Sequence, residues 1–115
     1  MPLLKLEISV PLSDGKQNAL LSSLSKVVAS AIGKPEQYVM VTISSAAMMI
    51  SAKAGDAAFV DVRSIGGLNG AVNQQLSQKI CALLKESLGL APERVYLNFS
   101  DIEASNWGWK GATFG

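Results

Sequence analysis

The second residue of the chain, Pro2, could supply a catalytic base. An initiator methionine followed by so small a residue is normally removed after synthesis, so the mature chain is expected to begin at Pro2. An ordinary α-amino group has a pKa of about 7.7–8.0, and the secondary amine of a terminal proline is more basic. Burial in apolar surroundings lowers the pKa of any amine because it disfavours the charged form. Pro2 is therefore a candidate general base near neutral pH, and a frayed terminus without a function is the alternative.

Two further segments could bind an anionic substrate. Lys34 stands between Gly33, which ends a predicted helix, and Pro35. Its ammonium group could hold a carboxylate, or it could only complement the carboxyl end of that helix. The segment 64–67, with the sequence Ser-Ile-Gly-Gly, closes a predicted strand and opens a predicted helix. Free backbone N–H groups there could hold a carboxylate or enolate oxygen, although a plain strand-to-helix turn is the alternative.

Aromatic residues gather at the C-terminal end of the chain. Residues 106–115 contain both tryptophans, Trp107 and Trp109, together with Phe114, and show no helical or long-strand pattern. These residues either pack on their own domain or form a lid over an apolar pocket. Tyr96 and Asn98 share one face of a predicted strand because side chains alternate with a period of two. They could act together in a site, or each could be a satisfied polar group in an interface.

The composition excludes several classes of function. The chain has 115 residues, which predicts a single domain over residues 1–115. Its net charge is only +1 and 17% of the residues are charged, so no nucleic-acid partner is expected. With no histidine and the single cysteine Cys81, no disulfide, metal site or histidine-dependent catalysis is predicted, and no cofactor is implied. Charged residues interrupt the apolar start of the chain, so neither a signal peptide nor a membrane span is expected. We therefore expect a cytoplasmic protein. Secretion by a route that needs no signal peptide stays open as an alternative.

Hydrophobic periodicity divides the chain into two similar halves. Apolar residues alternate over 4–10 and again from Ala58 to Val62, which indicates strands with one buried face. Each strand is followed by a helical stripe, which ends at Gly33 in the first half and at Gly89 in the second. Further strands are predicted over 38–43 and 95–100, so each half is a β-α-β unit. The fold class is therefore α+β, with a four-stranded sheet and two helices on one face.

Two regions lie outside this repeat. Residues 48–51 and a turn over 53–56 are expected to form a short hairpin that leads into the third strand. Two helices can cover only one face of the sheet, so the other face carries a mixture of polar and apolar side chains. Large apolar patches are seldom exposed in monomers, so we expect a closed homo-oligomer in which this face is covered.

Taken together, these segments resemble the macrophage migration inhibitory factor family of the tautomerase superfamily. The resemblance spans the chain and rests on Pro2, on the order of the segments 33–35, 64–66, 94–98 and 106–109, on Thr113-Phe114 and on the duplication. It implies a homotrimer with active sites between adjacent subunits and Pro2 as catalytic base. It also implies that Lys34 and Ile65 bind substrate and that the neighbouring subunit contributes Tyr96 and Asn98. The expected pocket wall consists of Tyr38, Trp107, Trp109 and Phe114.

The sequence also departs from the family pattern. The Cys-x-x-Cys pair of the vertebrate cytokine is replaced by Ala57 and Val60, which excludes thiol oxidoreductase activity at that site. The arginine and aspartate attributed to receptor mimicry correspond to Leu12 and Ala46. Trp107 replaces a smaller residue and Arg63 a histidine, and Trp107 should change the shape of the pocket and hence its substrate range.

Three functions remain compatible with the sequence. The first is a cofactor-free keto–enol tautomerase, an isomerase whose small-molecule substrates are phenylpyruvate-like 2-oxo acids. The second is a signalling or interaction protein of the same fold with vestigial catalysis. The third is a superfamily relative acting on a small unsaturated acid, although such relatives generally use extra arginines, and only Lys34 and Arg63 are candidates here.

Overall fold

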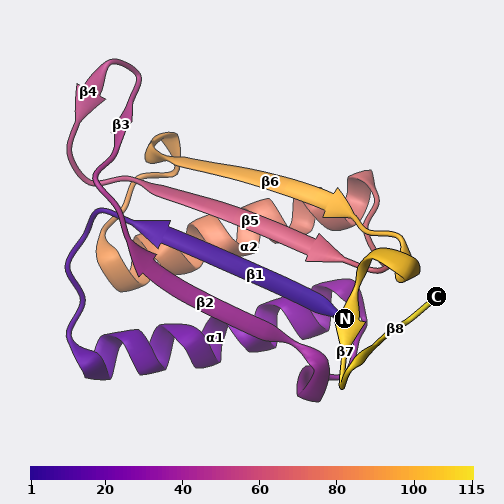
Figure 1. Cartoon of the computed structure of the whole chain (residues 1–115). Helices are drawn as coiled ribbons and strands as arrows, with labels where there is room; N and C mark the ends of the chain where they lie inside the picture. Colours follow the sequence, from indigo (N-terminus) through magenta and orange to yellow (C-terminus); the bar gives the residue numbers. More distant parts are fainter.

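The computed structural model describes residues 1–115 as a four-stranded mixed sheet with two helices packed behind it (Figure 1). The strands of the sheet are β1 (Pro2–Ile8), β2 (Met40–Ser45), β5 (Ala58–Ser64) and β6 (Val95–Asp101), in the order β2-β1-β5-β6. β1 runs parallel to β2 and antiparallel to β5, and β5 runs parallel to β6. The predicted α+β class and the duplicated β-α-β arrangement are confirmed.

Both helices begin and end at the residues that local chemistry favours. α1 (Asp14–Ile32) begins after Ser13, whose hydroxyl accepts a hydrogen bond from the Lys16 N–H at 3.2 Å. α2 (Gly70–Leu88) begins after Asn69, whose side chain caps it in the same way. Gly33 and Gly89 end the two helices in the left-handed conformation that glycine adopts without strain.

The core lies between the helices and one face of the sheet. Every second residue of β1 and β5 points into it, and residues spaced by four on each helix complete it. The buried side chains include Leu4, Leu6, Ile8, Leu24, Val28, Val60, Val62, Leu76, Ile80 and Leu84. Neither helix is long and apolar enough to cross a membrane.

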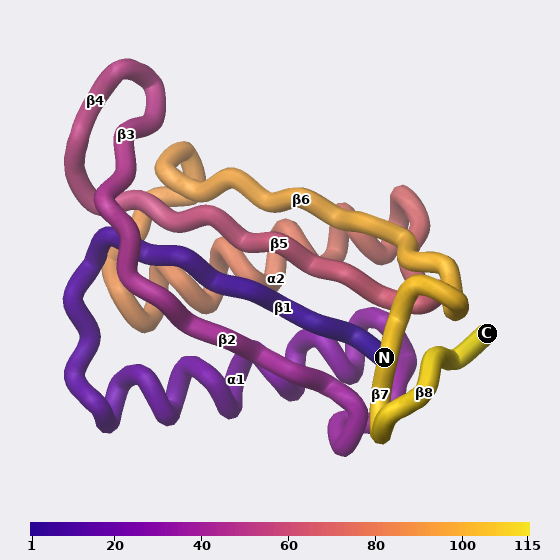
Figure 2. The backbone as a smooth tube through the Cα atoms, in the orientation of Figure 1, coloured from indigo at the N-terminus to yellow at the C-terminus, as the bar shows by residue number.

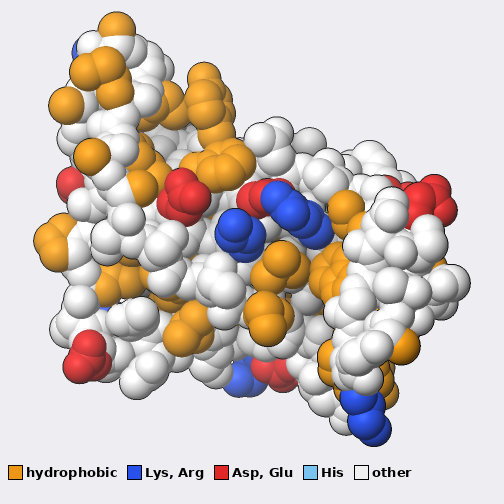
Figure 3. All heavy atoms as spheres, viewed as in Figure 1, with side chains coloured by type: hydrophobic (Ala, Val, Ile, Leu, Met, Phe, Trp, Pro, Cys, Tyr) orange, Lys and Arg blue, Asp and Glu red, His pale blue; other side chains and the backbone are white.

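The opposite face of the sheet is uncovered. Side chains of both charge signs gather over β1 and β5 at the middle of this face (Figure 3), where the strand register places Lys5, Glu7, Asp61 and Arg63. Tyr96 and Asn98 of β6 point to the same face and are exposed. This is the mixed polar and apolar face that the alternation predicted.

Several element boundaries differ from those predicted. β1 ends at Ile8 rather than at residue 10, because the Ser9 hydroxyl accepts a hydrogen bond from the Ala57 N–H at 2.9 Å and donates one to the Gly55 carbonyl at 3.0 Å. These bonds bend the chain away from the sheet. β2, the second strand of the first half, begins at Met40 rather than at residue 38.

The predicted hairpin is present, but its turn lies elsewhere. β3 (Met49–Ile50) pairs with β4 (Lys53–Ala54), so residues 53 and 54 are strand residues rather than turn residues. The turn is Ser51-Ala52, and both residues have positive φ, 55° and 59°, as the tightest hairpin turns require. The hairpin projects beyond the end of the sheet (Figure 2).

The aromatic C-terminal segment also forms a hairpin. After a short 3-10 helix (Ala104–Asn106), β7 (Gly108–Trp109) pairs with β8 (Ala112–Thr113). This hairpin lies beside the amino terminus, at the end of the sheet opposite β3–β4 (Figures 1 and 2). The segment that showed no regular pattern in the sequence thus closes the end of the sheet where the chain begins.

Candidate active site

The amino terminus is held at the end of an interior strand. Pro2 is the first residue of β1, where proline can lie in a sheet without breaking a ladder hydrogen bond. Its Cα partner is Ser64, the last residue of β5. The Pro2 side chain lies on the buried face of β1 with Leu4 and Leu6 and is less than 2% exposed. The terminus is therefore ordered by the sheet, unlike the frayed terminus of the alternative interpretation.

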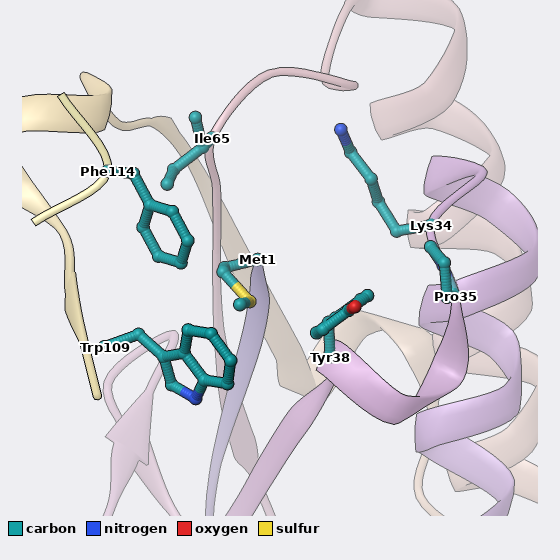
Figure 4. A pocket seen from close by; sticks show the side chains of 7 residues that line it. All are labelled: Met1, Lys34, Pro35, Tyr38, Ile65, Trp109 and Phe114. Carbon is teal, nitrogen blue, oxygen red and sulfur yellow. The ribbon is translucent and has the colours of Figure 1, made fainter.

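A cavity of about 390 Å³ opens directly at this terminus (Figure 4). Its wall is mostly apolar, and it contains one cationic side chain. The residues that line it are Met1, Lys34, Pro35, Tyr38, Ile65, Trp109 and Phe114. The seven residues come from four separate parts of the chain, and five of them were predicted from the sequence as substrate-binding or wall residues.

Lys34 reaches the cavity because of the way α1 ends. Gly33 turns the chain with φ 76°, and the N–H groups of both Gly33 and Lys34 donate to the Ala29 carbonyl. The Lys34 side chain then extends along the rim of the cavity, opposite Ile65 and Phe114 (Figure 4). The one ion pair in the structure joins Arg63 to Asp61 at 2.9 Å, so the Lys34 ammonium group is free to meet an anionic ligand.

Three aromatic rings form the apolar part of the wall. Tyr38 lies in a 3-10 turn (Glu36–Tyr38) that Pro35 opens, and the Tyr38 N–H donates to the Pro35 carbonyl at 3.1 Å. The ring of Tyr38 meets Trp109 edge-on with centroids 6.5 Å apart. Trp109 in turn stacks on Phe114 at 6.1 Å and 6°. Edge-to-face and stacked pairs at these distances are favourable, so the wall is pre-formed, and it suits a flat apolar group.

The electrostatics at the terminus favour a neutral amine. The pKa of the Met1 amino group is lowered from its ordinary value, first because burial disfavours the charged form and second because the Lys34 cation is nearby. The Met1 side chain itself stands in the middle of the cavity, with Phe114 and Trp109 on one side and Tyr38 on the other (Figure 4).

The turn that carries Ile65 differs from its prediction in one respect. It does not open α2, because the helix begins only at Gly70 with Asn69 as its cap. The helix N-terminus therefore cannot contribute to anion binding at residues 64–67. The Gly66 N–H is also already occupied, since it donates to the Asp101 carboxylate at 2.9 Å. The Ile65 side chain does line the cavity.

Trp107 and Arg63 lie beside this cavity rather than in it. Trp107 lines a groove of about 700 Å³ on the other side of Met1, together with Pro2, Leu3 and Met40 among others. It also lines a smaller hollow that includes Arg63 and Ile102. Met1, Tyr38 and Trp109 border both the groove and the main cavity, so the two spaces adjoin at the amino terminus.

Tyr96 and Asn98 are not brought to the site within one chain. Pro2 pairs with Ser64, and Ser64 pairs with Asp101, whereas Tyr96 lies five residues before Asp101 on β6. At about 3.4 Å per residue, Tyr96 is roughly 17 Å from that end of the sheet. It is also 67% exposed on the uncovered face. Within one chain, Tyr96 lines a separate hollow beside the β3–β4 hairpin and does not reach the cavity at the amino terminus.

Three contributors to the site were missed from the sequence. Met1 was treated only as a residue to be removed, and Pro35 only as a member of the segment 33–35 that follows the helix, although both line the cavity. Adjacency to Lys34 was a signal for Pro35. Asp101 was not singled out at all, and no local pattern would have revealed that it contacts Gly66.

The protein has the tautomerase fold, because two β-α-β units form one sheet and the amino terminus lies in a pocket at the end of an interior strand. Residues 1–115 match the family model described as macrophage migration inhibitory factor (MIF). The chain belongs to this family. It is 37% identical to the macrophage migration inhibitory factor of Meriones unguiculatus over 115 residues, which is 99% of each chain.

Solved structures agree with this assignment. The homologue from Prochlorococcus marinus is 38% identical and superimposes with a TM-score of 0.92 over 98% of this chain and 99% of that one. The similar protein from Entamoeba histolytica is 28% identical with a TM-score of 0.94, and 98% of each chain is covered. The fold of this chain is thus shared over its whole length with both of these solved structures.

Proposed function

We propose that this protein is a cofactor-free keto–enol tautomerase that acts on phenylpyruvate-like 2-oxo acids, with Pro2 as the general base. The observation that carries the proposal is the position of the amino terminus in an apolar cavity with one unpaired cation, where the pKa of the terminal amine is lowered. A base with a pKa near the working pH, a cation for the substrate carboxylate and a dry wall are what enolisation requires.

In the proposed mechanism, removal of Met1 creates the secondary amine of Pro2 and vacates the cavity. The neutral amine accepts a proton from the carbon next to the substrate carbonyl, and the electron pair of that C–H bond moves to form the enolate. The protonated amine, or water, then returns a proton to the enolate oxygen. Lys34 holds the carboxylate by a charge-assisted hydrogen bond, while Tyr38, Trp109 and Phe114 enclose the aromatic ring of the substrate.

The proposal includes a homotrimer with the active site between subunits. Tyr96 and Asn98 are exposed on the uncovered sheet face, too far from their own Pro2 to act on it. A neighbouring copy would bring them to the open side of the cavity, where a tyrosine hydroxyl and an amide could bind the substrate oxygens. Covering this face would also remove the exposed apolar surface of Tyr96 from water.

The test is a tautomerisation assay on two variants of Pro2. Pro2→Gly keeps a free amine but loses the ring and the secondary nitrogen, and one residue inserted before Pro2 converts the amine to an amide. Both should lower kcat/KM for phenylpyruvate by about 10²-fold or more, the range of a general base. Pro11→Gly, which removes a proline from the loop between β1 and α1, is the matched control and should keep wild-type turnover.

Circular dichroism and the subunit mass of each variant must match the wild type. If both Pro2 variants fold and retain wild-type turnover, Pro2 is not the base and the proposed mechanism is wrong. If the wild type itself has no turnover with phenylpyruvate, this substrate class is wrong.

A further inference from the structure

The turn that follows β5 is held by side chains at both polar groups of one glycine. Ser64 is fully buried, and its hydroxyl donates to the Gly66 carbonyl at 2.7 Å. The Gly66 N–H donates to Oδ1 of Asp101 at 2.9 Å. A turn fixed at its N–H and its C=O has little freedom to move, so the position of Ile65, the residue before Gly66, is determined by Ser64 and Asp101.

Asp101 is itself fixed by the sheet. It is the last residue of β6 and the Cα partner of Ser64 in the parallel ladder, and the next N–H, that of Ile102, donates to the Ser64 carbonyl at 2.9 Å. Its side chain does not line the cavity at the amino terminus. Its contact with the site is therefore indirect and passes through the Gly66 N–H.

The same turn also lies beside the outer part of the Lys34 side chain. Gly67 has a φ of 81°, and a Cβ built on it would lie 2.6 Å from Cγ2 of Ile32 and 3.6 Å from Cε of Lys34. The absence of a side chain thus lets the turn pack against the end of α1. One short turn carries Ile65 and packs beside Ile32 and Lys34 at the end of α1, so its position influences the separation of Ile65 and Lys34 across the cavity.

We infer that Asp101 is a positioning residue for substrate binding, which acts by holding the turn that places Ile65 opposite Lys34. The inference rests on the proposed function, in which Lys34 holds the substrate carboxylate in the cavity that Ile65 also lines. The role needs a hydrogen-bond acceptor at the Oδ1 position and no negative charge. Asparagine can supply that acceptor, whereas alanine cannot.

The experiment compares Asp101→Ala, Asp101→Asn and Glu103→Ala. Glu103 is the matched control, a nearby carboxylate whose side chain makes no hydrogen bond in the structure. Loss of one ordered hydrogen bond should raise KM for phenylpyruvate by about fivefold to tenfold in Asp101→Ala. The value of kcat should stay within about twofold because Pro2 is untouched, which is the signature of lost binding shared by ground and transition states. Asp101→Asn and Glu103→Ala should match the wild type.

A second measurement needs no substrate and separates this inference from the proposed function. Amide hydrogen exchange at Gly66, followed by NMR, should accelerate by about tenfold or more in Asp101→Ala, with a shift of the Ile65 methyl resonances, and both should be restored in Asp101→Asn. Unchanged exchange and methyl positions in Asp101→Ala would overturn the inference, and so would an Asp101→Asn variant that is as perturbed as Asp101→Ala. Absence of tautomerase activity in the wild type would instead count against the proposed function alone.

Discussion

Replacing Gly67 with alanine adds a methyl group where the structure has no room for one. Gly66 and Gly67 are adjacent and both have left-handed φ angles, 72° and 81°. A Cβ on Gly67 would lie 2.6 Å from Cγ2 of Ile32 and 3.3 Å from the Ile32 carbonyl oxygen, whereas nothing lies within 4 Å of a Cβ on Gly66. Gly66→Ala is therefore a matched control that has the same backbone strain without the clash.

The two substitutions should differ by the free energy of the clash. An L residue in the left-handed region costs about 1–2 kcal/mol, and this term applies to both variants. Overpacking against Ile32, which is only 7% exposed and cannot move into solvent, adds about 1–3 kcal/mol to Gly67→Ala alone. For a domain near 100 residues, 1 kcal/mol corresponds to about 4–8 °C in Tm. Gly67→Ala should thus melt roughly 4–24 °C below Gly66→Ala.

Thermal unfolding followed by circular dichroism, with all proteins at one concentration, measures this difference. A single concentration is needed because the Tm of an oligomer depends on it. The displaced turn should also push against the Lys34 stem, so Gly67→Ala should raise KM for phenylpyruvate more than Gly66→Ala does. If the two variants have the same Tm, the close packing of this turn on the end of α1 is wrong, and with it the argument that the turn sets the position of Lys34.

Three further predictions concern the terminus and the assembly. Intact mass spectrometry of untagged protein should show the loss of one methionine, and a retained Met1 would leave Pro2 as an amide and rule out the mechanism. Light scattering at micromolar concentration should give a trimer, and a monomer would leave Tyr96 without a pocket to complete. The pH profile of kcat/KM should show an acid limb. Burial and the nearby Lys34 cation lower the pKa of the terminal amine. Only the neutral amine is a base, so activity is lost as the pH falls below that pKa. Lys34→Met removes the cation, so the pKa should rise and the limb should move to higher pH, while Lys26→Met on the exposed face of α1 should leave it in place.

Local patterns were sufficient to predict the elements of the fold. The serine before α1, the glycines after both helices and the alternation in the strands each depend on residues a few positions apart. The sequence therefore determined the two β-α-β units and the face of each that is buried. It also predicted five of the residues that line the cavity, because the resemblance supplied a spatial order that spacing alone does not contain.

Tertiary structure decided how these residues are held. The bond between Gly66 and Asp101 joins residues 35 positions apart, and the close contact of Gly67 with Ile32 joins a loop to a helix end. Neither has a signature in the sequence, because each depends on the register of β5 with β6 and on the packing of α1 against the sheet. The position of Trp107 also has no signature in the sequence. The folded chain places it in the groove beside the cavity rather than in the cavity wall. Composition and periodicity report which face of an element is buried, whereas the contacts between elements depend on distances that only the folded chain fixes.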